Sequence, residues 1–256
     1  MQGIVVSMLW PSGDSPAPAF DLCPWLDLRL IPISELIEQL DQLPHRRIIK
    51  THSPADCIPI YTACRYLAVY RDPRDAFVSW ANHRRTMRPE LIEAMNADAS
   101  SDGVAPWTPR WSGDLDDLWQ EWVDWGTPME HLASWWPHRG QPYVFFVHYA
   151  DLQQDLVGEM RRIATFLDVE VPDDLWPAVV DRCGIAEMRK AHETSMLAVA
   201  FDGGAASFFN QGGSGRWQDL MPDHLVRSHE QLAASQLPAD ARQWMERGSL
   251  VSGWRP

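Results

Sequence analysis

The segment that most limits the possible folds is Tyr66–Asp75, which reads YLAVYRDPRD. Five successive apolar residues without alternation are typical of a strand buried on both faces, as in a parallel sheet. Asp72 can then cap a helix whose first position is Pro73. A buried strand that leads directly into a helix indicates an α/β fold, in which ligands collect at the carboxyl ends of the strands.

Other segments fit this architecture. Two further apolar runs, Arg47–Ile49 and Tyr143–Val147, are predicted to be buried parallel strands, and Met1–Leu9 is either a helix or a strand. Apolar spacing predicts helices at Ile33–Leu43, from Pro73 to about Arg85, and at Leu115–Trp125, Met129–Trp136, Asp151–Leu167, Pro172–Arg182, Ile185–Ala191, Pro222–Ala234 and Ala239–Arg247. Thr86–Gly113 is interpreted as a polar insertion and Ser195–Ser214 as a flexible loop. The sequence predicts a single α/β domain over residues 1–256, with a parallel sheet flanked by helices.

Composition limits the classes of ligand and compartment. With 35 acidic and 22 basic side chains, the formal net charge is −13, which argues against a broad surface for nucleic acid or anionic membranes. The four cysteines form no C-x-x-C pair and match no zinc pattern, so we expect a reduced cytoplasmic protein without a metal. No apolar run is long enough to cross a bilayer, and we expect no stable membrane insertion. An anionic ligand would need a local cluster of cations.

Such cations follow two of the predicted strands. The side chains that we expect to project into one crevice are Lys50, His52, Arg71 and Arg74. Ser79 lies about two turns into the helix that follows, and a strand-end arginine, a helix N-terminus and a hydroxyl together suit a phosphate monoester. The alternative, of equal weight on pattern alone, is that Arg71 and Arg74 pair with Asp72 and Asp75 at a solvated corner.

These residues resemble the cytosolic-type sulfotransferases. K-T-H-x-P occupies 50–54, and Y-R-D-P-R-D-A-x-x-S occupies 70–79. The resemblance continues in order at Gly126–Trp136, Val147–Leu152 and Gly212–Trp217, and so covers nearly the whole chain. Two motifs are similar to those of the mycobacterial glycolipid sulfotransferases, namely H-R-R-x-I-K-T-H at 45–52 and G-G-S-G-x-W at 212–217.

The resemblance implies a reaction and a role for each residue. A sulfuryl group would pass from 3′-phosphoadenosine 5′-phosphosulfate (PAPS) to a hydroxyl of a small-molecule or glycolipid acceptor by in-line displacement without a metal, leaving 3′-phosphoadenosine 5′-phosphate (PAP). His52 would be the general base, and Lys50 would stabilise charge on the leaving phosphate. The residues implied for nucleotide binding are Arg71 and Ser79 at the 3′-phosphate, Tyr149 at the adenine, Gly212, and Arg216 as a compensating cation.

Two departures from the family pattern bear on activity. The family carries a loop of the type P-K-S-G-T-T-W that cradles the 5′-phosphosulfate; Met1–Trp10 resembles the helix after it, and the sequence has no such loop. We therefore expect the P-loop-like sulfotransferase fold with its first strand and phosphate loop missing. The family pattern R-K-G-x-x-G-D-W reads Asn210–Trp217 here, with two neutral amides in place of cations and Arg216 in place of the aspartate.

An inactive remnant that binds a ligand or a partner is therefore the alternative to an active enzyme. Its binding surface would be the segment Trp107–Trp136, which contains seven of the 14 tryptophans. Indole rings offer flat apolar walls with one hydrogen-bond donor, so we predict that this segment is partly core and partly the wall of an acceptor pocket. The family's dimer motif is not recognisable after Trp217, so the oligomeric state stays unassigned.

Overall fold

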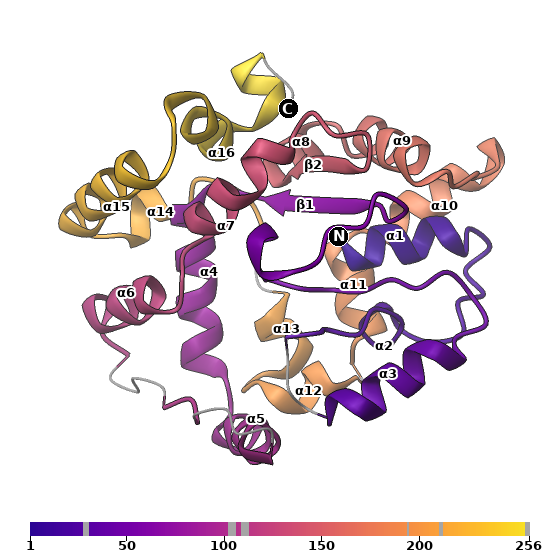
Figure 1. Ribbon diagram of the computed structural model, residues 1–256, viewed down its shortest axis with the longest axis horizontal. Coiled ribbons are helices and arrows are strands. Elements are labelled where there is room, and N and C mark those ends of the chain that lie inside the picture. Colours follow the sequence, from indigo (N-terminus) through magenta and orange to yellow (C-terminus); the bar gives the residue numbers. More distant parts are fainter. Residues whose placement is uncertain (28–30, 102–105, 109–112, 194, 210–211, 254–256) are drawn as a thin grey trace.

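In the part of the chain that the structure describes, two parallel strands form the sheet, β1 (Tyr66–Tyr70) and β2 (Val144–His148) (Figure 1). Their register pairs Tyr66 with Val144 and Tyr70 with His148, so the two carboxyl ends lie side by side. The computed structural model describes residues 1–27, 31–101, 106–108, 113–193, 195–209 and 212–253. The predicted parallel sheet is confirmed, with β1 as predicted and β2 shifted by one residue.

Helices surround the sheet. Those of the described chain are α1 (Gln2–Leu9), α2 (Ala19–Leu22), α3 (Ile33–Gln42), α4 (Pro73–Thr86), α5 (Pro89–Ser101), α6 (Leu115–Asp124), α7 (Pro128–Trp135), α8 (Tyr149–Gln154), α9 (Leu156–Leu167), α10 (Trp176–Asp181), α11 (Ile185–Ala191), α12 (Met196–Ala200), α13 (Gly204–Phe208), α14 (Trp217–Leu220), α15 (Asp223–Gln236) and α16 (Ala239–Ser252). Short 3-10 turns occupy Ala55–Cys57, Trp136–His138 and Asp173–Leu175. None of the described helices is long and apolar enough to cross a membrane.

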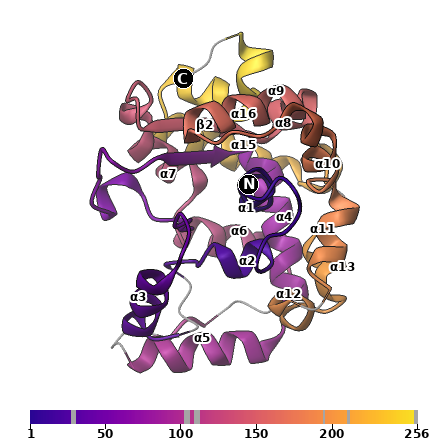
Figure 2. The same cartoon turned by 90° about the vertical axis from the view of Figure 1, so that its right-hand side faces the viewer.

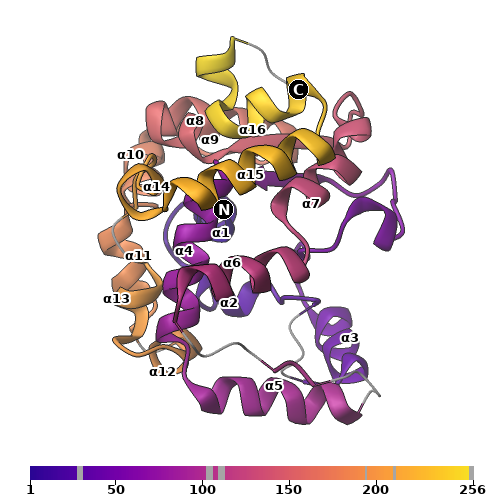
Figure 3. The same ribbon diagram turned by 90° about the vertical axis from the view of Figure 1, so that its left-hand side faces the viewer.

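Each face of the sheet is covered by a different set of helices. Against α7, α15 and α16 (Figure 3), the strands contribute Ala68, Tyr70, Val144 and Phe146, which pack with Leu132, Trp135, Trp244 and Met245. Against α1, α9 and α10 (Figure 2), they contribute Leu67, Phe145 and Val147, which pack with Ile4, Met160, Ile163 and Val179. The first of these faces is buried, whereas the second is covered only in part, since Val69 of β1 is 43% exposed.

Helix α4 begins as the sequence predicts. The Asp72 carboxylate accepts a hydrogen bond from the Arg74 N–H over 2.9 Å, and Pro73 occupies the first helical position. The buried face of α4 carries Phe77 and Ala81 against α6, with tryptophans of α6 completing a third core. This packing fixes the start of α4, and therefore Arg71 just before it, relative to the end of β1.

The predicted strand at Arg47–Ile49 is wrong. The segment is extended, but its only pairing in the described chain is an isolated parallel bridge between Lys50 and Trp25. The Leu26 N–H donates to the Lys50 carbonyl over 2.8 Å, and the Lys50 N–H donates to the Pro24 carbonyl over 2.9 Å. Ile49 is 49% exposed, so the run lacks the two-sided burial that its apolar sequence suggests.

Two further predictions are corrected. The single helix predicted over Asp151–Leu167 is two helices, because the Asp155 carboxylate accepts from the Gly158 N–H over 2.9 Å and so caps α9 anew. The polar insertion contains α5, and the predicted flexible loop contains α12 and α13. These helices form because Ala200 and Phe201 bury themselves among residues of the same segments, including Met87, Leu91 and Phe208.

Candidate active site

Arg71 stands at the carboxyl end of β1 with part of its hydrogen-bonding capacity unused. Its Nη2 donates to the Gly213 carbonyl over 3.3 Å and lies 3.8 Å from Asp75 Oδ2. Its guanidinium lies 4.9 Å from the centre of the Tyr149 ring. The Arg71 Nε is buried without a hydrogen-bond partner. An unpaired buried guanidinium N–H is a donor that a bound anion can satisfy.

Arg74, by contrast, is already paired. Its Nε and Nη2 donate to the two carboxylate oxygens of Asp72 over 2.9 and 2.7 Å, and its guanidinium lies 3.9 Å from the centre of the Trp217 ring. Glu246 Oε2 adds a contact at 4.0 Å. The alternative of a paired corner therefore holds for Arg74, and the prediction that Arg74 is a free cation of the site is wrong. For Arg71 the pairing with Asp75 is long and incomplete.

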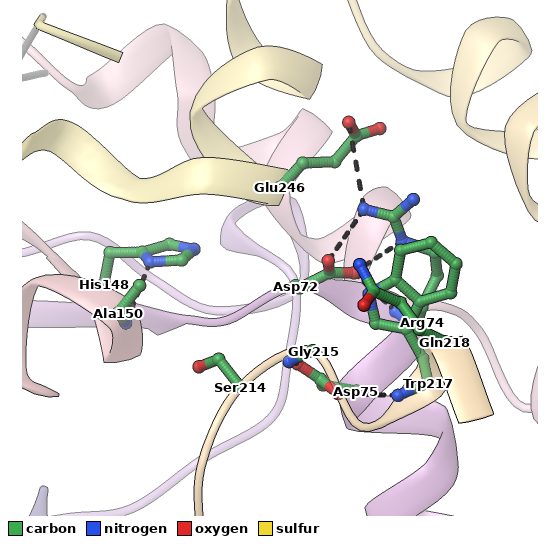
Figure 4. Close-up of a pocket in the computed structure, with 10 residues that line it drawn as sticks. All are labelled: Asp72, Arg74, Asp75, His148, Ala150, Ser214, Gly215, Trp217, Gln218 and Glu246. Atoms are coloured by element: carbon green, nitrogen blue, oxygen red, sulfur yellow. Dashed lines mark hydrogen bonds and ion pairs between the residues drawn. The ribbon is translucent and has the colours of Figure 1, made fainter. Parts of the chain in front are cut away.

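A cavity of about 240 Å³ lies beside this corner (Figure 4). Its lining consists of Asp72, Arg74, Asp75, His148, Ala150, Ser214, Gly215, Trp217, Gln218 and Glu246. His148 Nδ1 accepts from the Ala150 N–H over 3.2 Å, and its Nε2 lies 2.9 Å from the Met245 carbonyl, so Nε2 carries the proton. Three carboxylates and one paired arginine make this cavity unsuited to an anion, and neither Arg71 nor Lys50 lines it.

The nucleotide residues implied by the sequence lie partly together. The Tyr149 hydroxyl is 3.6 Å from the point that a Cβ of Gly212 would occupy, so Arg71, Tyr149 and Gly212 form one group. Gly212 has a φ of 68°, a left-handed conformation that favours glycine. Ser79 lies half-buried on α4 without a hydrogen-bond partner among the described residues. Asn210 and Gln211 lie outside the described residues.

Arg216 precedes α14 between two backbone groups that bind Asp75. The Gly215 and Trp217 N–H groups donate to the Asp75 carboxylate over 2.7 and 3.2 Å. Asp75 is only 2% exposed and lies in the first turn of α4. This carboxylate thus ties the glycine-rich segment to the start of α4, and the sequence did not reveal that role because the partners are about 140 residues apart.

Lys50 and His52 share one aromatic wall, the ring of Trp25. The Lys50 Nζ lies 3.6 Å from the centre of the Trp25 ring, and the His52 ring centre lies 4.6 Å from it with the planes at 69°. Asp27 accepts hydrogen bonds from the His52 backbone N–H and from Thr51 Oγ1. Trp25 and Asp27 carry no recognisable motif, which is why reasoning from sequence missed them.

The surroundings lower the pKa values of both basic groups. Burial lowers the pKa of Lys50 to about 8, although the negative charge of Asp27 opposes the shift. Desolvation by the neighbouring groups, followed by the positive charge of Lys50, lowers the pKa of His52 to about 4, although His52 is an exposed residue. At pH 7 Lys50 is therefore mostly charged and His52 is neutral.

His131 connects the two groups. Its Nδ1 lies 2.8 Å from the Tyr70 hydroxyl, and Tyr70 immediately precedes Arg71. Burial lowers the pKa of His131, and the opposing contributions come from the Ser53 backbone and Asp27. The expected single crevice is thus two neighbouring groups in the described chain, Lys50 with His52 and Arg71 with Tyr149, linked through Tyr70 and His131.

The tryptophans of the segment Trp107–Trp136 mostly belong to the core. Trp119, Trp122, Trp135 and Trp136 are all buried. Trp125 is 54% exposed, with its ring centre 4.5 Å from that of Trp107. The part of the prediction that places tryptophans of this segment in the core is therefore observed, the acceptor-pocket wall stays a prediction, and Trp111 lies outside the described residues.

Comparison with known proteins decides the family. The sulfotransferase domain model matches residues 12–244, which is most of the chain. This chain belongs to the sulfotransferase family. A glycolipid sulfotransferase of Mycobacterium bovis is 29% identical over 283 aligned positions, covering 96% of this chain and 84% of the relative. Sulfotransferase 1 family member D1 of Mus musculus is 22% identical, covering 84% of this chain and 71% of the relative.

Solved structures show the same sulfotransferase fold. Mouse sulfotransferase SULT7A1 complexed with PAP superposes with a TM-score of 0.69 at 20% identity, covering 99% of this chain and 85% of that structure. A retinol dehydratase in complex with androsterone and inactive cofactor PAP gives a TM-score of 0.68 at 18% identity, covering 93% and 77%. The predicted family and fold class are thus confirmed.

Proposed function

We propose that this sulfotransferase transfers the sulfuryl group of PAPS to a hydroxyl of a glycolipid or another small-molecule acceptor, with His52 as the general base. The observation that carries the proposal is that the His52 ring and the Lys50 Nζ both lie against the ring of Trp25. A histidine can accept the proton of a hydroxyl, and an ammonium beside it can stabilise the negative charge that develops on a leaving phosphate. The glycolipid class follows the names of the mycobacterial relatives.

Each residue has a distinct task in this proposal. His52 accepts the proton of the acceptor hydroxyl while the hydroxyl oxygen forms its bond to sulfur. Lys50 places a positive charge where negative charge develops as the bond from sulfur to the leaving phosphate oxygen breaks. PAPS, when bound, supplies the sulfuryl group and departs as PAP. Positioning and charge then supply most of the rate.

Arg71, Ser79, Tyr149 and Gly212 are proposed to hold the nucleotide, with Arg216 as a nearby cation. The unpaired Nε of Arg71 supports this assignment, because a phosphate oxygen would complete its hydrogen bonding. The Tyr149 ring beside Arg71 offers a flat face for the adenine. PAP in the fold neighbours shows which nucleotide this fold accommodates in those proteins.

Replacing Arg71 with alanine is expected to weaken PAP binding by about 10- to 100-fold, since hydrogen bonds to charged groups contribute about 1.5–3 kcal/mol. Isothermal titration of PAP into both proteins measures the change. Arg65→Ala is the matched control, because Arg65 precedes the opposite end of β1 and pairs with the exposed Asp168. Equal PAP affinity in the Arg71 variant and the wild type would contradict the assignment.

The pH dependence of turnover should report the protonation state of Lys50. Because its pKa is about 8, the stabilising ammonium is present below pH 8 and is lost above it. We expect kcat/KM, which reports the free enzyme, to fall above about pH 8, and kcat to keep its plateau to higher pH because a bound anion favours the ammonium. In Lys50→Arg the basic limb should disappear. An unchanged limb in that variant would assign it to another group.

Transfer from radiolabelled PAPS to a panel of glycolipid, phenol and steroid hydroxyls tests the proposed function directly. We expect a labelled sulfate ester with at least one class and none when His52 is replaced by alanine. A chain that binds PAP but labels no hydroxyl acceptor would favour the ligand-binding alternative.

A further inference from the structure

A short loop, Pro24–Asp27, runs along the segment that carries Lys50 and His52. Backbone hydrogen bonds around the bridge between Trp25 and Lys50 hold one end of the loop against this segment. Among them, the Leu26 N–H donates to the Lys50 carbonyl over 2.8 Å. Beyond Lys50 the backbone ladder stops, because Trp25 and Lys50 form only an isolated bridge. The segment that carries His52 therefore needs some other restraint.

The Asp27 carboxylate supplies that restraint through four donors. Oδ1 accepts from Thr51 Oγ1 over 2.6 Å and from Ser53 Oγ over 3.2 Å. Oδ2 accepts from the backbone N–H of His52 and from Trp25 Nε1, the latter over 3.1 Å. The carboxylate thus binds all three residues of the Thr51–Ser53 segment and also the indole against which the His52 ring lies.

We propose that Asp27 is the positioning residue of the active site, holding the Thr51–Ser53 segment so that the His52 ring stays against Trp25. This inference rests on the proposed role of His52 as the general base. Asp27 contacts the backbone N–H of His52 and not its ring. Its contribution to the reaction is therefore to position the ring. A carboxylate is suited to the task because it only accepts hydrogen bonds, whereas an amide would place its NH2 group against the two donors that one carboxylate oxygen now accepts.

The position of the His52 ring and the charge of Asp27 change the pKa of His52 in opposite directions, so a titration can distinguish the two effects. The titratable groups that face the ring are Lys50 and Asp27 from the paired segments and His131 from α7. Removing the Asp27 charge alone would lower the pKa of His52 further, because a carboxylate favours the imidazolium. Releasing the ring into water would raise that pKa from about 4 toward the ordinary value of about 6.5.

The deciding experiment is a proton NMR titration of the histidine rings in the wild type and in Asp27→Asn, with the His52 signal assigned from His52→Gln. We expect the pKa of His52 to rise by at least about one unit in Asp27→Asn. In the same variant we expect kcat to fall about 10- to 100-fold, with its acidic limb moved to higher pH, and the KM for PAPS to stay within about twofold.

Two further variants keep the test decisive if Asp27→Asn does not fold. Thr51→Ala with Ser53→Ala removes two of the four donors and leaves the Asp27 charge in place, so it should move the pKa of His52 upward as well. Asp56→Asn, an exposed carboxylate four residues after His52, should leave both the pKa and kcat as in the wild type. Thermal unfolding of each variant records whether the fold is intact.

A His52 pKa that stays at or below about 4 in Asp27→Asn, or in the double alanine variant when the former is unfolded, overturns the positioning role. The NMR titration needs no turnover. A failure of the proposed function would therefore appear as absent sulfuryl transfer with the pKa shift intact, and a failure of this inference as an unshifted pKa in an active enzyme.

Discussion

Replacing His52 with glutamine is expected to lower sulfuryl transfer by about 10²- to 10⁴-fold, the usual contribution of a positioned general base. With a pKa of about 4, the wild-type ring is neutral throughout the neutral range, so it has a nitrogen free to accept a proton, although it is a weaker base than an ordinary histidine. Glutamine keeps much of the size and polarity of the ring but cannot take up that proton. Initial rates with radiolabelled PAPS at saturating acceptor measure the loss.

PAP affinity separates a catalytic defect from a binding defect. His52 belongs to the Trp25 group and makes no contact with Arg71 or Tyr149 in the described chain, so His52→Gln should bind PAP within about threefold of the wild type. His224→Gln, an exposed histidine on α15, is the matched control and should keep full activity. Substantial turnover in His52→Gln would show that another group serves as the base.

The second large effect concerns stability. Arg84 and Glu121 are only 3% and 4% exposed, and the Arg84 Nε donates to Glu121 Oε1 over 3.1 Å. Arg84→Met removes this ion-pair partner from a buried carboxylate, which is expected to cost about 3–5 kcal/mol. That is a large part of the 5–15 kcal/mol typical of a folded domain. Urea unfolding followed by circular dichroism measures the difference.

Two comparisons test the physical reason for that loss. Arg84→Met combined with Glu121→Leu removes both charges and should recover most of the stability, because the buried carboxylate that lost the Arg84 guanidinium is then also removed. Arg85→Met, at the neighbouring exposed position, loses only hydrogen bonds to the Gly113 carbonyl and should cost less than about 1 kcal/mol. A double variant no more stable than Arg84→Met would assign the loss to packing against Trp107 instead.

The elements that the sequence predicted well are those encoded by neighbouring residues. The strand β1 and the start of α4 follow from ten consecutive residues, since an unbroken apolar run and an Asp-Pro cap act locally. Local sequence led to a wrong strand prediction at Arg47–Ile49, because an apolar run forms a strand only where another strand lies beside it. The break between α8 and α9 had a usable signal, Asp155 three residues before Gly158, which apolar spacing alone overlooked.

Reasoning from sequence could select the residues of the candidate site, but it could not predict which of them lie together. Lys50, His52 and Arg71 stand out because they follow apolar runs and match a family motif. Their partners Trp25, Asp27 and His131 come from loops and helices whose positions depend on the folded chain. The choice between a free and a paired Arg74 was likewise undecidable from an alternating run of arginine and aspartate, because both pairings are sterically possible.

The hydrogen bonds from Gly215 and Trp217 to Asp75 have a consequence for biosynthesis. The start of α4 leaves the ribosome about 140 residues before the segment that satisfies its buried carboxylate. Closing so long a loop is among the slower events of folding. A nascent chain therefore carries Arg71 without its Gly213 contact until about 140 further residues have been made, and the corner between β1, α4 and the glycine-rich segment is completed only then. Premature termination before residue 213 would yield a product with the sheet and α4 in sequence but without this corner.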